Sequence, residues 1–363
     1  MSLNDATLRQ AISTVVDPHT GQDFVASKAL KALRIDGSHV SVDVELGYPA
    51  KSLFPGLRQQ LVAAIKQVAG VGQVTVQLSS RVVAHAAQRG VQLLPQVKNI
   101  IAVASGKGGV GKSTTAVNLA LALAAEGASV GLLDADIYGP SQPMMMGIEG
   151  RPESSDGKTM DPLENHGVQV MSIGFLVAKD EAMIWRGPMA TQALEQLLRQ
   201  TNWRDLDYLI VDMPPGTGDI QLTLSQRVPM TGAVIVTTPQ DIALLDAKKG
   251  IKMFEKVGVP ILGIVENMAV HICSQCGHTE HIFGHEGGKR MAEEFGMPYL
   301  GALPLDLSIR LQADSGKPTV VSDPDGPVSG IYKTIARQVA VGIAAKAKDF
   351  SAKFPTITVS KDT

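Results

Sequence analysis

The feature that most restricts how this chain folds is one glycine-rich segment. Residues Gly106 to Ser113 read Gly-Lys-Gly-Gly-Val-Gly-Lys-Ser, which matches the pattern G-x-x-x-x-G-K-[ST]. An apolar, strand-like run at 100–104 precedes the segment, and a helical stretch at 113–126 follows it. Glycines let consecutive backbone N–H groups face phosphate oxygens, and a helix N-terminus adds the positive end of its dipole. The segment therefore predicts an α/β protein that binds ATP with Mg²⁺, and a turn that only closes a βα unit is the alternative.

The side chains of this loop have distinct expected roles. Lys112 is expected to reach the β- and γ-phosphates, and the Ser113 hydroxyl to bind Mg²⁺. The general pattern does not require Lys107, which we expect as an additional cation at the γ-phosphate unless it is a solvated surface lysine. Asn267 follows an apolar run at 261–265 and is expected to contact the base. The predicted nucleotide-binding residues are Gly106, Lys107, Gly108, Gly109, Val110, Gly111, Lys112, Ser113, Thr114 and Asn267.

Acidic residues follow two further strand-like runs, where an open parallel sheet places its ligand contacts. Asp134 and Asp136 follow the run at 129–133, and Asp212 follows the run at 208–211. Asp212 is expected to lie near Mg²⁺, Asp136 to orient the attacking water, and Asp134 to assist with Mg²⁺. The alternative for such residues is the capping of a helix after a strand. The predicted catalytic residues are Lys107, Lys112, Asp136 and Asp212, and the predicted magnesium ligands are Ser113, Asp134 and Asp212.

The length of 363 residues favours more than one domain. We expect a small α+β domain at 1–82, a linker at 83–97, a P-loop ATPase domain at 98–350 and a flexible tail at 351–363. In the first domain the sequence predicts two helices and two alternating strands and shows no catalytic cluster, which favours an adaptor or docking role. The expected helices are 5–15 and 56–68, and the expected strands are 40–46 and 74–78.

Strand-like and helical stretches alternate through the second domain, which is typical of a mostly parallel, doubly wound sheet. A polar segment at 147–167, broken by Gly and Pro, predicts an exposed loop or a short hairpin. The expected strands are 100–104, 129–133, 208–211, 233–237 and 261–265, and the expected helices are 113–126, 243–257 and 328–350.

Cys273 and Cys276 are the two cysteines of the sequence, and their C-x-x-C spacing indicates metal or redox chemistry. Two thiolates at this spacing can bind one soft metal centre, whereas an iron–sulfur cluster usually takes four. A two-fold dimer would supply two pairs and complete a cluster. A Zn²⁺ site made with two of the nearby histidines fits the spacing equally well. A redox dithiol fits less well, because the pair does not open a helix after the first strand.

The composition gives no sign of a nucleic-acid or membrane partner. The net charge is -2, and 19% of residues are charged and 44% hydrophobic, an ordinary globular balance. No uninterrupted apolar run approaches the length that spans a bilayer, and the first ten residues do not resemble a secretory signal. We expect a cytoplasmic protein.

Taken together, these residues resemble the Mrp/ApbC family, which are P-loop ATPases of the deviant Walker, MinD-like superfamily that carry iron–sulfur clusters. The resemblance covers 99 to about 345, and the N-terminal unit is similar to the small assembly-factor domain of bacterial members. The motifs that carry it are Ala-Ser-Gly-Lys-Gly-Gly-Val-Gly-Lys-Ser-Thr, Asp-Ala-Asp-Ile-Tyr-Gly-Pro-Ser, Asp-Met-Pro-Pro-Gly-Thr-Gly-Asp, Glu-Asn-Met, the cysteine pair followed by Ile-Phe-Gly, and Leu-Pro-Leu-Asp.

The resemblance implies a homodimer in which Lys107 contacts the phosphates of the opposite subunit. It also implies that Cys273 and Cys276 bridge a [4Fe–4S] cluster between two subunits, for transfer to apoproteins with ATP hydrolysis. Recipient apo iron–sulfur proteins and cluster-assembly scaffolds are then the expected partners. Eukaryotic relatives hold a second cluster on extra N-terminal cysteines, which this chain lacks, so a single bridging site is expected.

Two other functions remain as alternatives. A positioning ATPase of the ParA/MinD type would use the same lysines and acids, but it has no use for Cys273 and Cys276. In the second alternative the chain is a zinc-binding scaffold and the nucleotide only stabilises the fold. Its function should then survive substitution of Lys112.

Overall fold

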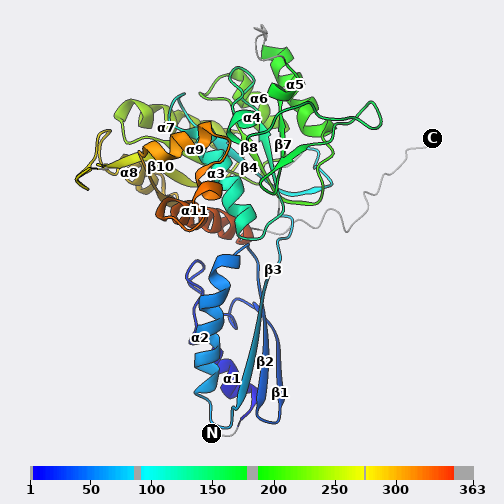
Figure 1. Ribbon diagram of the computed structural model, residues 1–363, viewed down its shortest axis with the longest axis vertical. Coiled ribbons are helices and arrows are strands. Elements are labelled where there is room, and N and C mark those ends of the chain that lie inside the picture. The colour runs from blue at the N-terminus through cyan, green and yellow to red at the C-terminus, as the bar shows by residue number, and fades with distance from the viewer. Residues whose placement is uncertain (1–2, 86–90, 178–186, 274, 347–363) are drawn as a thin grey trace, which may run out of the picture.

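The computed structural model describes residues 3–85, 91–177, 187–273 and 275–346. It contains a small N-terminal unit and a larger α/β unit (Figure 1). The predicted tail at 351–363, the end of the predicted last helix and part of the predicted linker lie outside these residues.

The N-terminal unit is a three-stranded sheet with two helices on one face (Figure 1). Strand β2 is central, pairing antiparallel with β1 and parallel with β3, so that α2 forms the crossover between β2 and β3. Every second residue of β2 is buried, from Val40 to Leu46, against the helices. The elements are α1 (Asp5–Ile12), β1 (Leu30–Asp36), β2 (His39–Leu46), the 3-10 turn η1 (Lys51–Leu53), α2 (Phe54–Lys66) and β3 (Gln73–Ser80).

Strand β1 was not expected from the sequence. It reads Leu-Lys-Ala-Leu-Arg-Ile-Asp and lies at the edge of the sheet, where none of its residues is fully buried. An edge strand with one exposed face and one half-exposed face shows no clean alternation of apolar and polar residues. Helix α1 also ends at Ile12, three residues before the expected end.

The larger unit has a nine-stranded sheet in the order β11-β10-β9-β4-β8-β5-β7-β6, with β12 beside β10. The strands are parallel except for β6 and β11. They are β4 (Val97–Ala104), β5 (Val130–Asp134), β6 (Leu163–Asn165), β7 (Val168–Ser172), β8 (Leu206–Asp212), β9 (Gly232–Thr237), β10 (Ile261–Ile272), β11 (Thr279–Glu280) and β12 (Tyr299–Pro304). The predicted doubly wound P-loop fold is confirmed.

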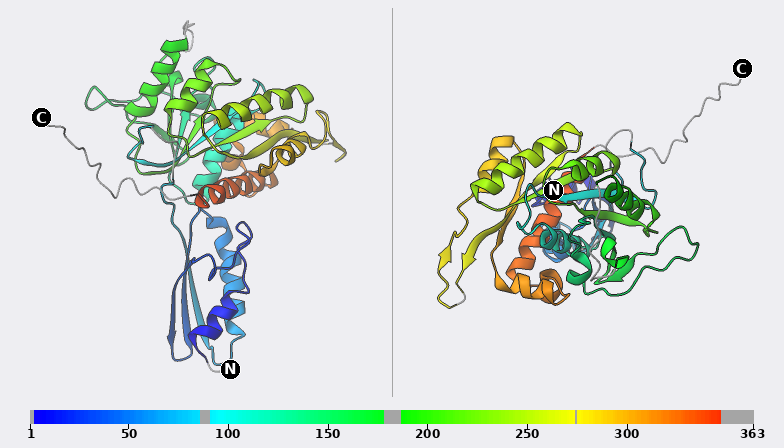
Figure 2. Two further views of the ribbon diagram at one scale, coloured as in Figure 1. Left: turned by 180° about the vertical axis from the view of Figure 1, so that it is seen from behind. Right: turned by 90° about the horizontal axis from the view of Figure 1, so that it is seen from above.

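Helices cover both faces of this sheet (Figure 2), as expected when right-handed crossovers lead to both sides of β4 in the strand order. Helices α3 and α11 pack on each other over one face, and α7 and α8 pack on each other over the other. The helices are α3 (Lys112–Ala125), α4 (Gln142–Met145), α5 (Gly187–Gln200), α6 (Asp219–Arg227), α7 (Asp241–Lys256), α8 (Gly287–Phe295), α9 (Leu307–Asp314), α10 (Thr319–Ser322) and α11 (Pro327–Ala344), with a 3-10 turn η2 (Ile173–Phe175). The segment 147–167 contains β6, which forms a short hairpin with β7. A short hairpin is one of the two forms predicted for this segment.

The two ends of α3 contact different parts of the molecule. The glycine-rich loop precedes its first residue, Lys112, at the carboxyl edge of the sheet. At its other end, Glu126 accepts backbone hydrogen bonds from the N-terminal unit: its carbonyl from Lys51 N (3.1 Å), and its carboxylate from Ser52 N (2.9 Å). The N-terminal unit therefore contacts the end of α3 that lies away from the loop.

Candidate nucleotide and cluster site

The glycine-rich loop leaves no room for side chains at two of its glycines. A Cβ at Gly106 would lie 2.1 Å from the carbonyl carbon of Asp246 on α7. A Cβ at Gly111 would lie 2.1 Å from Nδ2 of Asn267, and φ of Gly111 is +82°, in the left-handed region. Glycine is therefore required at both positions to bring the loop between β10 and α7.

Lys112 and Asp212 form a buried ion pair at the start of α3. Lys112 Nζ donates to Asp212 Oδ1 and, at 3.1 Å, to Ser113 Oγ, and it lies 3.8 Å from Asp136 Oδ2. The Lys112 side chain is 6% exposed and that of Asp212 is fully buried. Strands β4, β5 and β8 are neighbours, so the groups that follow them meet at one edge of the sheet. The structure thus brings together the predicted phosphate-binding lysine and two of the predicted acids.

Asp134 is fully buried and its carboxylate is already surrounded by donors. Oδ1 accepts from the backbone N–H of Asp136 (3.2 Å), while Oδ2 accepts from Ser141 N (3.0 Å), Gln142 N (3.1 Å) and Ser172 Oγ (3.0 Å). Burial and the nearby Asp212 carboxylate raise the pKa of Asp134 to about 7. These contacts fix the loop that follows β5, and direct binding of Mg²⁺ by Asp134 stays a prediction.

Asp136 lies closer to the surface than its two neighbours. Its side chain is 14% exposed, and burial raises its pKa above the ordinary value. The orienting of water by Asp136 stays a prediction.

Gln142 is a site residue that the sequence did not reveal. Its side chain is fully buried, and Nε2 donates to Asp212 Oδ2 (2.8 Å) and to the carbonyl of Ser113 (3.1 Å). The first of these bonds joins residues 70 positions apart in the chain. No spacing rule predicts such a contact, and the only signal is that Gln142 directly follows the Asp-Ala-Asp-Ile-Tyr-Gly-Pro-Ser motif.

Asn267 contacts the loop from β10. Its Nδ2 donates to the carbonyl of Val110 at 2.9 Å, and the side chain is buried. The next residue, Met268, has φ of +55°, so β10 changes direction directly after this contact. The pairing of β10 with β12 also shifts register between Glu266 and Val270. Contact of Asn267 with the base stays a prediction.

Lys107 is exposed at the rim of the same loop, together with Gly108 and Gly109. Ser105 Oγ donates to the carbonyl of Lys107 at 2.8 Å, which fixes the backbone there. Contact of Lys107 with the nucleotide of a second copy stays a prediction.

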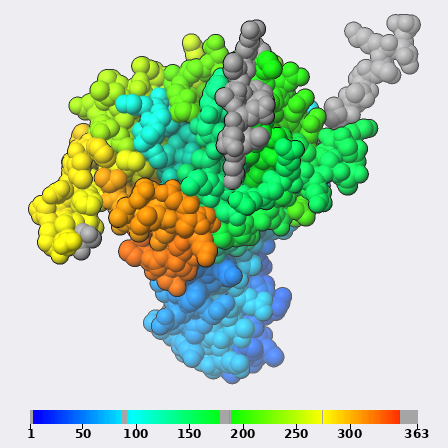
Figure 3. Space-filling model, turned by 45° about the horizontal axis from the view of Figure 1, so that its top comes forward, coloured from blue at the N-terminus to red at the C-terminus, as the bar shows by residue number. Residues whose placement is uncertain are grey.

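Cys273 and Cys276 lie in the turn that joins β10 to β11. The turn is closed by hydrogen bonds from Cys273 N to the His278 carbonyl (2.9 Å) and from Gly277 N to the Cys273 carbonyl (2.8 Å). Both thiols are free, Cys276 exposed and Cys273 half-buried. The backbone N–H groups of Gln275 and Cys276 lower the pKa of the Cys273 thiol. In Figure 3 this part of the chain, in yellow, projects from the edge of the molecule.

Two of the neighbouring histidines contact backbone carbonyls through Nδ1. Nδ1 of His271 contacts the Leu305 carbonyl (3.1 Å), and Nδ1 of His281 contacts the Ala269 carbonyl (2.9 Å). Within the ranges that the structure describes, no group of three or more His, Cys, Asp or Glu side chains is placed to hold a metal ion. Among the described residues, the cysteine pair of one chain offers two thiol ligands, and a cluster held by four thiolates would need two more.

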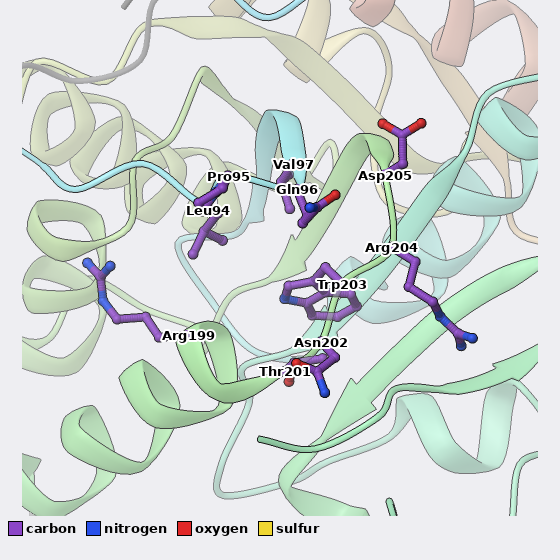
Figure 4. Close-up of a pocket in the computed structure, with 10 residues that line it drawn as sticks. All are labelled: Leu94, Pro95, Gln96, Val97, Arg199, Thr201, Asn202, Trp203, Arg204 and Asp205. Carbon is purple, nitrogen blue, oxygen red and sulfur yellow. The ribbon is translucent and has the colours of Figure 1, made fainter. Parts of the chain in front are cut away.

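A separate depression of about 700 Å³ lies at the opposite edge of the sheet, where β4 and β8 begin (Figure 4). It is lined in part by Trp203, Arg199 and Arg204. Trp203 Nε1 donates to the Leu198 carbonyl (3.1 Å), and the two arginines point away from each other in Figure 4. None of the predicted site residues lines it, so this depression is separate from the candidate site.

Comparison with known proteins identifies the family of this chain. Residues 96–340 match the family described as NUBPL iron-transfer P-loop NTPase. The iron-sulfur cluster carrier protein of Pseudomonas fragi is 60% identical over 278 residues, which cover 76% of this chain and 97% of that protein. The chain belongs to this family of cluster-carrying P-loop NTPases. The iron-sulfur cluster carrier protein of Escherichia coli strain K12 is 53% identical over 324 residues, covering 89% of this chain and 88% of that protein.

The N-terminal unit of this family member has its own match. Residues 5–76 match the family described as iron-sulfur cluster assembly protein. The resemblance drawn from the motifs is confirmed for both parts of the chain.

Solved structures agree with the fold. A nucleotide-binding protein from Archaeoglobus fulgidus in complex with ADP aligns with a TM-score of 0.57 at 36% identity, over 65% of this chain and 93% of that chain. The cell division ATPase MinD of Pyrococcus furiosus aligns with a TM-score of 0.50 at 22% identity, over 66% of this chain and 98% of that chain, and shows the fold alone. Among the described residues, no helix is both long and apolar enough to cross a membrane.

Proposed function

We propose that this chain is an ATP-dependent carrier that binds a [4Fe–4S] cluster between two copies of itself and passes it to apoproteins. The observation that carries the proposal is that strand β10 joins the two candidate sites. Asn267 in this strand holds the loop carbonyl of Val110, and Cys273 directly follows the strand's last residue. A displacement of the loop by nucleotide would reach the cysteine pair along β10, through the bend at Met268.

The cysteine pair supports a shared cluster. Two thiolates from each of two chains supply the four ligands that such a cluster usually takes. Cys276 is exposed, and the N–H groups around the Cys273 sulfur favour its thiolate form. Transfer is then an exchange of ligands: each bond from iron to Cys273 or Cys276 is replaced by one to a recipient thiolate, with no net oxidation or reduction.

The loop residues support ATP hydrolysis. Ser113 Oγ and the Asp212 carboxylate are oxygen ligands of the kind that Mg²⁺ prefers, and both accept a hydrogen bond from the Lys112 ammonium group. Bound Mg²⁺ neutralises charge on the phosphates. Lys112 exchanges its carboxylate partners for phosphate oxygens, and Asp136 orients the attacking water. Lys107 contacts the nucleotide of the second copy.

The expected partners follow from this activity. Apo iron–sulfur proteins receive the cluster and assembly scaffolds supply it, with the N-terminal unit as the docking element. Free thiols and a cluster exposed at a surface need a reducing compartment, so we place the protein in the cytoplasm.

A transfer assay tests the proposal. The reconstituted protein is mixed anaerobically with an apo [4Fe–4S] dehydratase, with and without ATP, and the recovered dehydratase activity is measured. Recovery should depend on ATP in the wild type, be strongly reduced in Lys112→Ala and be absent in Cys273→Ala. Transfer by Lys112→Ala at the wild-type rate would reduce the nucleotide to a structural role and contradict the proposal.

A further inference from the structure

Gln142 is placed between two groups that would hold Mg²⁺. Its Nε2 donates to Asp212 Oδ2 and to the carbonyl of Ser113. The amide cannot be turned round, because Oε1 would then face a carboxylate and a carbonyl oxygen, which are acceptors only. The side chain therefore fixes the Asp212 carboxylate to the first turn of α3.

The other end of this amide has an unused acceptor. Gln142 Oε1 is buried and, in the part of the chain that the structure describes, has no hydrogen-bond partner. Oγ of the neighbouring Ser141 is buried and unpartnered in the same way. Buried polar atoms are nearly always paired, so the free acceptor of Gln142 indicates that a further polar group binds there.

The position of Gln142 is itself set by Asp134. The Asp134 carboxylate accepts from the backbone N–H of Gln142, from that of Ser141 and from Ser172 Oγ. Because the Asp134 carboxylate already accepts these hydrogen bonds, it influences the magnesium site through the residues that it positions. Asp134 and Gln142 thus form one chain of contacts that ends at the Asp212 carboxylate.

We propose that Gln142 is a positioning residue of the magnesium site, which holds Asp212 in place and accepts a hydrogen bond from a water molecule of the Mg²⁺ shell through Oε1. Mg²⁺ usually keeps several of its waters when it binds to a protein, and such waters need acceptors. Partners outside the first shell typically change metal affinity 10–100-fold. This inference rests on the proposed function only for the binding of Mg²⁺ with nucleotide.

Magnesium titrations test the inference on the full chain. Binding of a fluorescent, slowly hydrolysed ATP analogue is followed against Mg²⁺ concentration, and again in EDTA, with the thermal midpoint of the nucleotide-free protein measured alongside. Gln142→Met keeps the volume and removes the amide, and should raise the Mg²⁺ concentration for half-saturation by about tenfold or more. Binding in EDTA should stay unchanged. Gln142→Asn, whose amide is one methylene shorter, should give a smaller shift.

Gln169→Met is the matched control. Gln169 on β7 is also buried, and its amide exchanges two hydrogen bonds with the backbone of Arg204, away from the loop. Its magnesium midpoint should equal that of the wild type. An unchanged midpoint in both Gln142 variants, or an equal loss of binding in EDTA and in Mg²⁺, would overturn the inference. Failure to load a cluster would leave these titrations unaffected, so the two proposals fail separately.

Discussion

Arg337 Nη1 on α11 lies 2.5 Å from Glu126 Oε1, at the end of the helix that begins with the nucleotide loop. The side chains are 9% and 0% exposed. Both also bind the N-terminal unit: Ser52 Oγ lies 2.6 Å from Glu126 Oε1 and 3.0 Å from Arg337 Nη1, and Arg337 Nε donates to His19 Nε2 at 2.8 Å. One buried ion pair thus joins α3, α11 and the N-terminal unit.

Removal of this arginine should destabilise the protein strongly. Arg337→Ala leaves the Glu126 carboxylate buried without its cation, which typically costs about 3–5 kcal/mol. Urea unfolding measures the loss. Arg310→Ala is the control, because the Arg310–Asp314 pair is largely exposed and should contribute no more than about 1 kcal/mol. Equal effects of the two substitutions would contradict the structural role given to Arg337.

Lowering the pH should weaken the contact between α11 and the N-terminal unit through His19. Its Nε2 accepts from Arg337 only in the neutral ring, and burial together with the Arg337 charge lowers the pKa of His19 below 6.5. The unfolded chain then binds more protons than the folded one, so stability falls as pH drops from about 6.5 through the lowered pKa. Urea unfolding at several pH values should show this slope in the wild type. His19→Gln should flatten it, and an unchanged slope would contradict the account.

The two lysines of the loop should behave differently. Lys112→Ala removes the phosphate contact and leaves Asp212 buried and unpaired, so nucleotide binding should be lost and the nucleotide-free protein destabilised. Lys107 is exposed, so Lys107→Ala should change stability by no more than about 0.5 kcal/mol. It should retain nucleotide binding and lose hydrolysis. Nucleotide fluorescence and phosphate release check both, and wild-type hydrolysis by Lys107→Ala would contradict its proposed role.

The sequence predicted the parts of the fold with strong local patterns. The glycine loop, the apolar run of β4 and the acids at the ends of β5 and β8 can each be recognised from a few consecutive residues. The sheet order then brings Lys112, Asp136 and Asp212 together. Strand β1 was missed because an exposed edge strand shows no clear alternation of apolar and polar residues.

Long-range contacts could not be predicted. Neither the bond from Gln142 to Asp212 nor the pair of Arg337 and Glu126 follows from local spacing, because packing alone brings these residues together. A buried glutamine or glutamate in a helical or loop segment looks like an ordinary surface residue in the sequence. The cysteine pair was found, but its spacing alone could not separate a cluster from zinc.

Anaerobic reconstitution tests the central claim most directly. Wild type and Cys273→Ala are incubated with iron and sulfide, and then analysed for iron, sulfide, zinc, visible absorption and mass in solution. The account predicts a wild-type dimer with about four irons and four sulfides per two chains, and no cluster in Cys273→Ala. Zinc without iron, or a cluster-loaded protein that remains a monomer, would contradict it.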